Sequence, residues 1–269
     1  MNKAILLGAS GVAVAFAMLA VGFVAGKQGA VADTAPQAMM SEAVMDRPEV
    51  ERIVREYLIA NPEVMLEVQA ALDTKQKEEQ RVASLQVIQD AKSDIFNSAH
   101  DGVVGNPNGK VTIVEFYDYN CGFCKRAQED MLALTESDPD LRFVLKEFPI
   151  LGPDSQKAHV VSQAFNNLMP EKYGEFHNQL LGSKGRATEA AAMKIAVSLG
   201  ADEAKLREEM KNPTISDTFA KTYDLANKLA ITGTPSYVVG DEVVFGALGK
   251  DVLTKKIASA KAACASAAC

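Results

Sequence analysis

The chain has 269 residues, of which 48% are hydrophobic and 23% are charged, a composition typical of a folded globular protein and incompatible with disorder throughout. Its 28 lysine and arginine residues are outnumbered by 35 aspartate and glutamate residues, which gives a formal net charge of −7. This acidic balance argues against a nucleic-acid partner, because a phosphate-binding surface needs clustered basic residues. The length predicts one or two domains.

The first 32 residues are predicted to lie outside the folded part of the protein. Residues 4–25 carry no charged side chain, and Lys3 and Lys27 flank them. This stretch is longer than the roughly 7 to 15 residues of a signal-peptide core and about long enough to span a bilayer. Ala30-Val31-Ala32 has the small-x-small form of a cleavage site. We therefore favour export with cleavage, and a retained membrane anchor at residues 4–25 stays open.

A linker at residues 33–48 and a helical arm at residues 49–98 are predicted next. Asn61-Pro62-Glu63 separates a short helix from a longer one that runs to about Asn97, because it supplies a cap, a first-turn proline and an early acid. The longer helix has too thin an apolar stripe to form a core by itself. Its packing partner is either a second copy of the chain or the rest of the same chain, and no sustained heptad register decides between them.

The main domain is predicted at residues 99–262 and opens with a turn-rich bridge at residues 100–109. An apolar run at residues 111–117 predicts a central strand that is covered on both faces. Glu115 lies inside this run, where a carboxylate is costly unless it finds a partner or takes up a proton. We therefore expect a functional group at this position.

Shortly after this strand the chain reads Cys121-Gly122-Phe123-Cys124 and continues with good helix formers. Two intervening residues at a helix start place both sulfur atoms within bonding reach. The free backbone N–H groups and the helix dipole then stabilise a thiolate on Cys121. A low thiol pKa makes Cys121 a nucleophile and a good leaving group, as disulfide exchange requires.

A zinc site and a structural disulfide account for the cysteine pair less well. Half a zinc site would need a second pair of ligands, and His100, His159 and His177 are scattered singly, so we expect no metal and interpret each histidine as a surface or helix residue. A purely structural disulfide does not explain the order of strand, CxxC and helix. Redox chemistry in an extracytoplasmic space, where disulfides persist, is the favoured interpretation.

A second strand is predicted at residues 141–148 as the parallel neighbour of the first. Lys146 lies late in this apolar strand, as Glu115 does in the other. We hypothesise that the two side chains meet beneath the cysteines and move the proton of Cys124. In the alternative, Lys146 and Glu147 mark a strand end in water.

Residues 155–230 are predicted as a helical insertion, broken at glycine and proline positions. Thr234-Pro235 then stands at the start of a strand, and a second short strand follows a glycine turn. A final helix at residues 250–262 completes the α/β domain.

This order of elements resembles the thioredoxin fold with the inserted helical domain of the DsbA-like thiol:disulfide oxidoreductases, over residues 104–262. The resemblance implies that Cys121 is the nucleophile and Cys124 the resolving cysteine, with a cis-proline at Pro235. It also implies a periplasmic enzyme with no cofactor, acting on exported proteins that carry thiols or disulfides, and re-oxidised by a membrane partner. The substrate-binding residues it implies are Thr234, Pro235, Gly122 and Phe123.

The arm, in particular residues 57–64, is similar to the N-terminal region of ScsC-like relatives, some of which oligomerise through it. Gly122-Phe123 lacks the histidine of strongly oxidising DsbA members, which predicts a milder oxidant. Oxidase and isomerase are therefore not separated by these residues. A third alternative is a thiolate Cu(I)-binding envelope protein that only retains the fold.

A second cysteine pair, Cys264 and Cys269, lies in the tail at residues 263–269. Five residues apart on a helix, the two side chains would face different directions, so a local disulfide needs an unwound tail. We expect such a local disulfide, and the alternative is a Cu(I) site or an electron relay to Cys121 and Cys124.

Overall fold

The computed structural model describes residues 46–266, with side chains as far as residue 263. The chain divides into two compact units, residues 1–59 and residues 60–269. The predicted leader at residues 1–32 and nearly all of the predicted linker at residues 33–48 lie outside the described residues. None of the helices in the described part is long and apolar enough to cross a membrane.

In the first unit, helix α1 (Arg47–Ala60) begins two residues earlier than predicted. It does so because the Asp46 carboxylate accepts a hydrogen bond from the Glu49 backbone N–H at 3.0 Å and caps the first turn. None of its residues is buried. Four of its apolar side chains lie on one side of the helix and are between 40% and 56% exposed: Val50, Ile53, Val54 and Tyr57.

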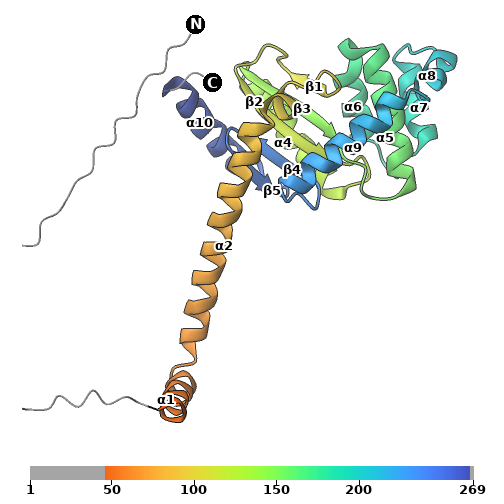
Figure 1. The fold of residues 1–269 in the computed structure, drawn as a ribbon. Helices are drawn as coiled ribbons and strands as arrows, with labels where there is room; N and C mark the ends of the chain where they lie inside the picture. The colour runs from red at the N-terminus through yellow and green to blue at the C-terminus, as the bar shows by residue number, and fades with distance from the viewer. Residues whose placement is uncertain (1–45, 267–269) are drawn as a thin grey trace, which may run out of the picture. The chain divides into compact units, whose positions relative to one another are not determined.

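In the second unit, the rest of the arm forms α2 (Glu63–Asp90) and α3 (Lys92–Phe96), not the single helix predicted to about residue 97. The break lies at Ala91, whose φ of −107° and ψ of 21° leave the helical region. Residues 63–83 include no buried residue, whereas Ile88 and Ile95 are buried. Within the second unit, the C-terminal part of α2 and α3 therefore pack on the sheet (Figure 1).

A mixed sheet forms the centre of the second unit, with the strand order β1-β3-β2-β4-β5 among the described residues. Strand β2 pairs in parallel with β3 and antiparallel with β4, so the apolar run predicted as a central strand does lie in the middle. The strands are β1 (Gly102–Gly105), β2 (Val111–Tyr117), β3 (Leu141–Glu147), β4 (Ser236–Val239) and β5 (Glu242–Phe245).

Strand β1 lies in the stretch that the sequence predicts as a bridge, and it pairs antiparallel with β3 at the sheet edge. It was not predicted because its four residues begin and end with glycine. Gly102 is required by packing, since a Cβ there would collide with the ring of Tyr173. The strand exists because its backbone hydrogen bonds go to β3, which no local pattern reveals.

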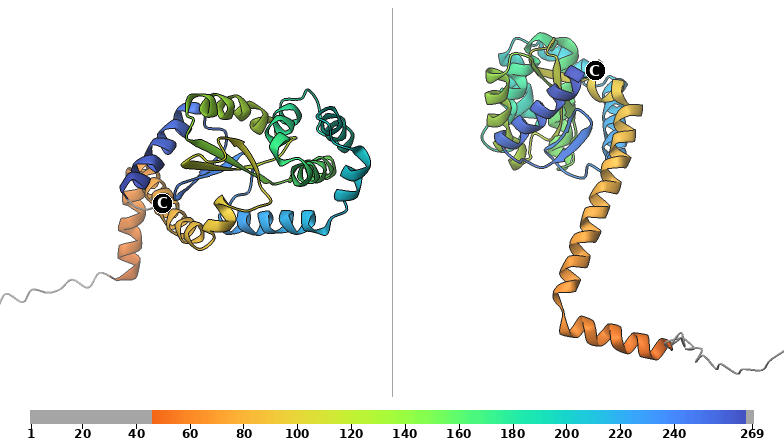
Figure 2. Two further views of the ribbon diagram at one scale, coloured as in Figure 1. Left: turned by 90° about the horizontal axis from the view of Figure 1, so that it is seen from above. Right: turned by 90° about the vertical axis from the view of Figure 1, so that its left-hand side faces the viewer.

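Helices cover both faces of this sheet (Figure 2). One face is covered by α4 (Gly122–Ser137) and α10 (Lys250–Ser266), and the other by α9 (Pro213–Lys228) with the C-terminal part of α2 and α3. The remaining helices gather at one end of the sheet. They are α5 (Pro153–Leu168), α6 (Tyr173–Leu181), α7 (Glu189–Ser198) and α8 (Glu203–Glu209), with a 3₁₀ turn at Pro170–Lys172.

The alternation of side chains along the strands divides the apolar core into two clusters. Ile113 and Phe143 belong to the cluster beneath α4, whereas Val114, Phe116 and Val144 belong to the cluster beneath α9 and α3. The predicted α/β class, a thioredoxin fold with an inserted helical domain and a helical arm before it, is confirmed. The predicted breaks of the insertion agree with the observed helix ends within a few residues.

Candidate redox site

The two cysteines lie where β2 feeds helix α4. Cys121 is the N-cap residue of α4, and its sulfur accepts a hydrogen bond from the Cys124 backbone N–H at 3.4 Å. Gly122 begins the helix and is exposed, while the Cys124 side chain is fully buried in the first turn. The predicted arrangement at the helix start is therefore present, with both thiols free.

The surroundings of the two thiols drive their pKa values apart. The pKa of Cys121 falls to about 5, chiefly because the Cys124 thiol donates a hydrogen bond to the Cys121 sulfur. Hydrogen bonds from Thr234 and from backbone N–H groups lower this pKa further. Burial, the hydrogen bond to Cys121 and the Glu115 charge raise the pKa of Cys124 far above its ordinary value. Cys121 is thus the thiolate at neutral pH, and Cys124 is the thiol.

A loop from the other end of the chain closes over the cysteines. The Thr234–Pro235 peptide bond is cis, as the family resemblance implies, and Pro235 is buried. The Cys121 sulfur lies 3.1 Å from the Thr234 carbonyl oxygen. The structure therefore brings together Cys121, Cys124, Thr234 and Pro235.

A cavity of about 310 Å³ opens beside this loop. Phe123 forms one wall and is 58% exposed, with the Arg126 guanidinium 4.3 Å from its ring centre. Phe245 lies on the opposite β5 side and is also exposed. Residues 232–236, Gly246 and Ala247 complete the lining, and Thr234 among them also contacts the reactive sulfur.

Glu115 lies on the same sheet face as the cysteines, and only 4% of it is exposed. Burial, together with the Cys121 charge, raises the pKa of its carboxyl to about 8. Tyr237 of β4 is its cross-strand partner, and the Tyr237 pKa is raised by burial and by the Glu115 charge. At neutral pH, Glu115 holds a proton close to both sulfur atoms.

The predicted Glu115–Lys146 pair does not form, and that prediction is wrong. Glu115 stands opposite Leu145, and Lys146 stands opposite Phe116, so the two side chains point to opposite faces of the sheet. Lys146 instead bonds Asp101 at 2.5 Å and contacts the Asp94 carbonyl oxygen of α3. It anchors the arm and lies away from the cysteines.

The alternative for this strand end, in which Lys146 and Glu147 lie in water, is also wrong because both are 3% exposed. The sequence could not reveal this, since the covering residues come from α3 and from the helical insertion. Burial raises the pKa of Asp101 to about 6, and the Lys146 charge opposes that rise.

Sequence reasoning missed a buried polar group behind the cysteines. Asp118, Glu147 and His159 are all buried. His159 lies on helix α5, in agreement with its interpretation as a surface or helix residue, but the sequence did not reveal its burial. The His159 Nε2 accepts a hydrogen bond from the Tyr119 backbone N–H at 3.2 Å. A usable signal was present, because Ser155, His159 and Ser162 are spaced as one face of a helix.

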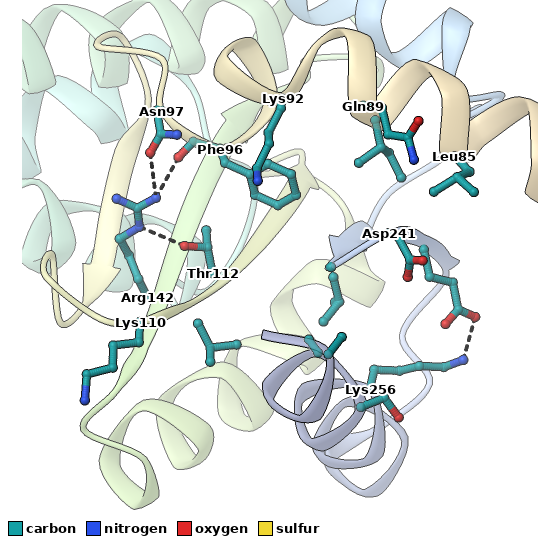
Figure 3. Close-up of a pocket in the computed structure, with 18 residues that line it drawn as sticks. Leu85, Gln89, Lys92, Phe96, Asn97, Lys110, Thr112, Arg142, Asp241 and Lys256 are labelled. Atoms are coloured by element: carbon teal, nitrogen blue, oxygen red, sulfur yellow. Dashed lines mark hydrogen bonds and ion pairs between the residues drawn. The ribbon is translucent and has the colours of Figure 1, made fainter. Parts of the chain in front are cut away.

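A larger cavity, of about 610 Å³, lies at the end of the sheet away from the cysteines, between α2, α3 and α10 (Figure 3). Arg142 lines it and donates to the Phe96 carbonyl oxygen and the Thr112 hydroxyl. These bonds attach the C-terminal end of α3 to the sheet. The cavity contains no cysteine among its described lining residues.

The tail cysteines lie outside the described side chains, so neither the local disulfide nor the relay at Cys264 and Cys269 is tested. Within the described residues, no group of three or more histidine, cysteine or acidic side chains is arranged to hold a metal ion.

Two family models match the chain. The DSBA-like thioredoxin domain matches residues 112–258, and the copper resistance protein ScsC N-terminal domain matches residues 46–79. The first match spans both cysteines and the cis-proline, and the second spans α1 and the first part of α2.

Two solved structures show the same similarity. A thioredoxin-like oxidoreductase from Silicibacter pomeroyi is 38% identical, with a TM-score of 0.60 over 63% of this chain and 97% of that chain. Proteus mirabilis ScsC in a compact conformation is 29% identical, with a TM-score of 0.61 over 80% of this chain and 98% of that chain.

Among curated proteins, Disulfide bond formation protein D of Bacillus subtilis is 28% identical over 155 residues, which are 53% of this chain and 68% of that protein. The Na(+)/H(+) antiporter NhaA 1 of Salinispora arenicola is 26% identical over 162 residues, which are 60% of this chain. The chain spans only 24% of that antiporter's length.

Proposed function

Because the chain belongs to the DsbA-like thioredoxin domain family, we propose that it is a thiol:disulfide oxidoreductase that forms or rearranges disulfides in exported proteins. One observation carries the proposal: a buried sulfur with a pKa of about 5 stands at the start of α4 against the backbone of Thr234 and Pro235. A structural disulfide would need neither the low pKa nor the adjacent cavity.

In oxidation, a substrate thiolate attacks the Cys121 sulfur of the Cys121–Cys124 disulfide. The Cys121–Cys124 bond breaks, a mixed disulfide forms, and Cys124 leaves with the electron pair. Glu115 supplies the proton that Cys124 needs, since both groups are buried and the Cys124 pKa is raised. A second substrate thiolate then attacks the mixed disulfide, and Cys121 leaves as its stable thiolate.

In rearrangement, the same residues act in the reduced enzyme. The Cys121 thiolate attacks a substrate disulfide and releases one substrate thiolate, which can attack a different substrate disulfide. If the substrate stalls, the Cys124 sulfur attacks Cys121 in the mixed disulfide. The bond between Cys121 and the substrate breaks, the proton of Cys124 passes to the departing substrate sulfur, and the Cys121–Cys124 disulfide forms. The low pKa of Cys121 serves both directions, so direction depends on the supply of oxidant or reductant.

The substrate is an unfolded or partly folded polypeptide that lies along residues 232–236. Extended peptide backbone pairs with the backbone of the loop before β4, and Phe123 and Phe245 accept an apolar side chain beside the substrate cysteine. The compartment is the periplasm, in agreement with the predicted export signal, and a membrane redox partner renews the active form.

The arm joins copies of the chain into a homo-oligomer. The support is the exposed apolar stripe of α1 and the match of residues 46–79 to the ScsC N-terminal domain. Light scattering of the full chain and of a Val54→Glu variant tests this. We expect the variant to be monomeric and unchanged in Cys121 titration, and a monomeric wild type would contradict the proposal.

Cu(I) binding is a second candidate, because the arm matches a domain named for copper resistance. The matched segment has no cysteine or histidine, so Cys121 and Cys124 would supply the thiolates. Cu(I) retained stoichiometrically by the reduced protein, without catalysis of exchange, would favour this role.

The deciding experiment is the refolding of scrambled ribonuclease beside the oxidation of reduced ribonuclease, with Cys121→Ser as control. Reactivation of the scrambled substrate identifies an isomerase, and oxidation alone identifies an oxidase. Failure of both reactions would contradict the proposed function.

A further inference from the structure

The loop at residues 118–120, called the redox loop below, joins β2 to α4, and its backbone contacts both cysteines. The Cys121 backbone N–H donates to the Asp118 carbonyl oxygen at 2.9 Å. A hydrogen bond from the Asp118 backbone also lowers the pKa of Cys124, against the larger effect of burial. The position of this loop therefore sets how both sulfur atoms lie at the start of α4.

One face of α5, the first helix of the insertion, holds the loop. Ser155 donates to the Asp118 carboxylate at 2.8 Å, His159 accepts from the Tyr119 N–H, and the Ser162 hydroxyl lies 2.7 Å from the Tyr119 hydroxyl. All three α5 side chains belong to fully buried residues. The redox loop is thus attached to the insertion by side chains, in addition to its own backbone bonds.

The contacts of His159 fix its tautomer. Its Nε2 accepts the Tyr119 N–H and so carries no hydrogen, whereas its Nδ1 lies against the Glu147 carboxylate and donates to it. A proton on Nε2 would face the Tyr119 N–H and break that contact. Glu147 in turn accepts from Ser162 at 2.6 Å and from Tyr173 at 3.0 Å.

Few other titratable groups face this pair. Asp118 lies 4.0 Å from the His159 Nε2, and the rings of Tyr117 of β2 and of Tyr119 pack on the imidazole. His177 of α6 packs against the same tyrosines, and burial lowers its pKa to about 3, so it stays neutral. No cation among these groups competes with His159 for Glu147.

We propose that Glu147 and His159 form a positioning pair of the redox centre: the carboxylate orients the imidazole, and the imidazole holds the Tyr119 amide and with it the Asp118 backbone at both cysteines. Neither residue touches the reacting atoms. The inference rests on the thiol:disulfide exchange proposed above.

The test is the pH titration of the Cys121 thiolate absorbance, together with the equilibrium of the protein with glutathione, in His159→Leu and His159→Gln. We expect His159→Leu to raise the Cys121 pKa by about one unit, a tenfold change in ionisation. The glutathione equilibrium should shift up to tenfold towards the disulfide form, or about 30 mV. In His159→Gln the side-chain amide keeps an acceptor for the Tyr119 N–H and a donor for Glu147. This variant should therefore restore most of the wild-type Cys121 pKa and glutathione equilibrium.

The matched control is Gln163→Leu, because Gln163 is equally buried on α5 but donates to the His100 carbonyl oxygen. It should lower the melting temperature and leave both redox values unchanged. If His159→Leu behaves like this control, His159 is merely structural and the proposal is overturned. A wild-type protein whose Cys121 pKa is not lowered would instead contradict the proposed function itself.

A measurement on the unaltered protein covers the case in which His159→Leu does not fold. Nitrogen NMR of the imidazole should show the neutral Nδ1–H tautomer at neutral pH, with slow exchange of the Tyr119 amide hydrogen. An Nε2–H tautomer or an imidazolium would overturn the proposal, because neither accepts the Tyr119 N–H.

Discussion

The two faces of the central sheet bury charged side chains to the same extent and use them differently. Beneath α4, Glu115 is 4% exposed, and none of the described cationic side chains lowers its pKa, so its carboxyl takes up a proton. Beneath α3, Lys146 is 3% exposed and is bonded to Asp101. Burial alone therefore does not identify a catalytic group, because the partner decides whether a charged side chain moves protons or stabilises the fold.

The comparison also separates the redox chemistry from the attachment of the arm. Arg142 and Lys146 donate to carbonyl oxygens at the C-terminal end of α3, where the helix dipole favours positive charge. Changes on that face should alter stability and leave thiol chemistry intact. Changes at Glu115 should alter the thiol chemistry and the pH dependence of stability.

The largest effect on stability is expected from Lys146→Met. The substitution leaves Asp101 buried without its cation, which costs about 3 to 5 kcal/mol of unfolding free energy. Denaturant unfolding measures this cost, and Lys110→Met is the control because the Lys110 side chain is 82% exposed. A Lys146→Met protein as stable as the control would show that the ion pair does not anchor the arm.

The next effect concerns the pH dependence of the unfolding free energy in the reduced Glu115→Gln variant. Because the folded pKa of Glu115 is about 8 against an ordinary value of 4.5, the folded protein binds the extra proton between these values and loses stability as pH rises through them. The variant should therefore gain stability relative to wild type from pH 5 to pH 8, by at most about 1.4 kcal/mol per pH unit. Unfolding curves at several pH values test the sign, and a constant difference would contradict it.

The unfolding free energy of the reduced wild-type protein should change little between pH 5 and pH 8. The Cys121 pKa is lowered, so its contribution rises with pH above about 5 and offsets the fall from Glu115. Oxidation removes the Cys121 contribution, and the fall with pH should then emerge.

A smaller free-energy change is expected in the rate of thiol exchange by Glu115→Gln. Loss of the proton donor for Cys124 should slow formation of the mixed disulfide about tenfold to a hundredfold at neutral pH, at the low end of proton-transfer catalysis. Stopped-flow kinetics of the oxidised protein with a peptide thiol measures the rate. Equal rates would leave Glu115 no role in exchange, and Lys146→Met should not slow the reaction.

The smallest effect is expected in the exposed arm, at Arg81→Ala. Arg81 pairs with Glu78 one turn away at 2.9 Å, and both side chains are at least half exposed. Such surface pairs contribute little to stability, because water and salt screen their charges. Thermal unfolding should show a change of about a degree, and a larger loss would mean that this part of α2 is covered by a partner.

Much of the fold could be predicted because its signals are local. The apolar run of β2, the helix formers after Cys124 and the glycine and proline breaks of the insertion depend only on neighbours in the chain. Strand β1 and the break at Ala91 could not be predicted, since one depends on pairing with β3 and the other on where α2 meets the sheet.

The redox centre could be located from a local pattern, because Cys121 and Cys124 stand at a helix start, where the helix terminus stabilises a thiolate on the capping residue. The partners of the buried charges depend instead on the packing of distant elements. Two strands in parallel register place Glu115 and Lys146 on opposite faces, and α5 brings His159 to a loop 40 residues away in the chain. No local sequence pattern predicts such contacts, because they depend on which faces of distant elements pack together.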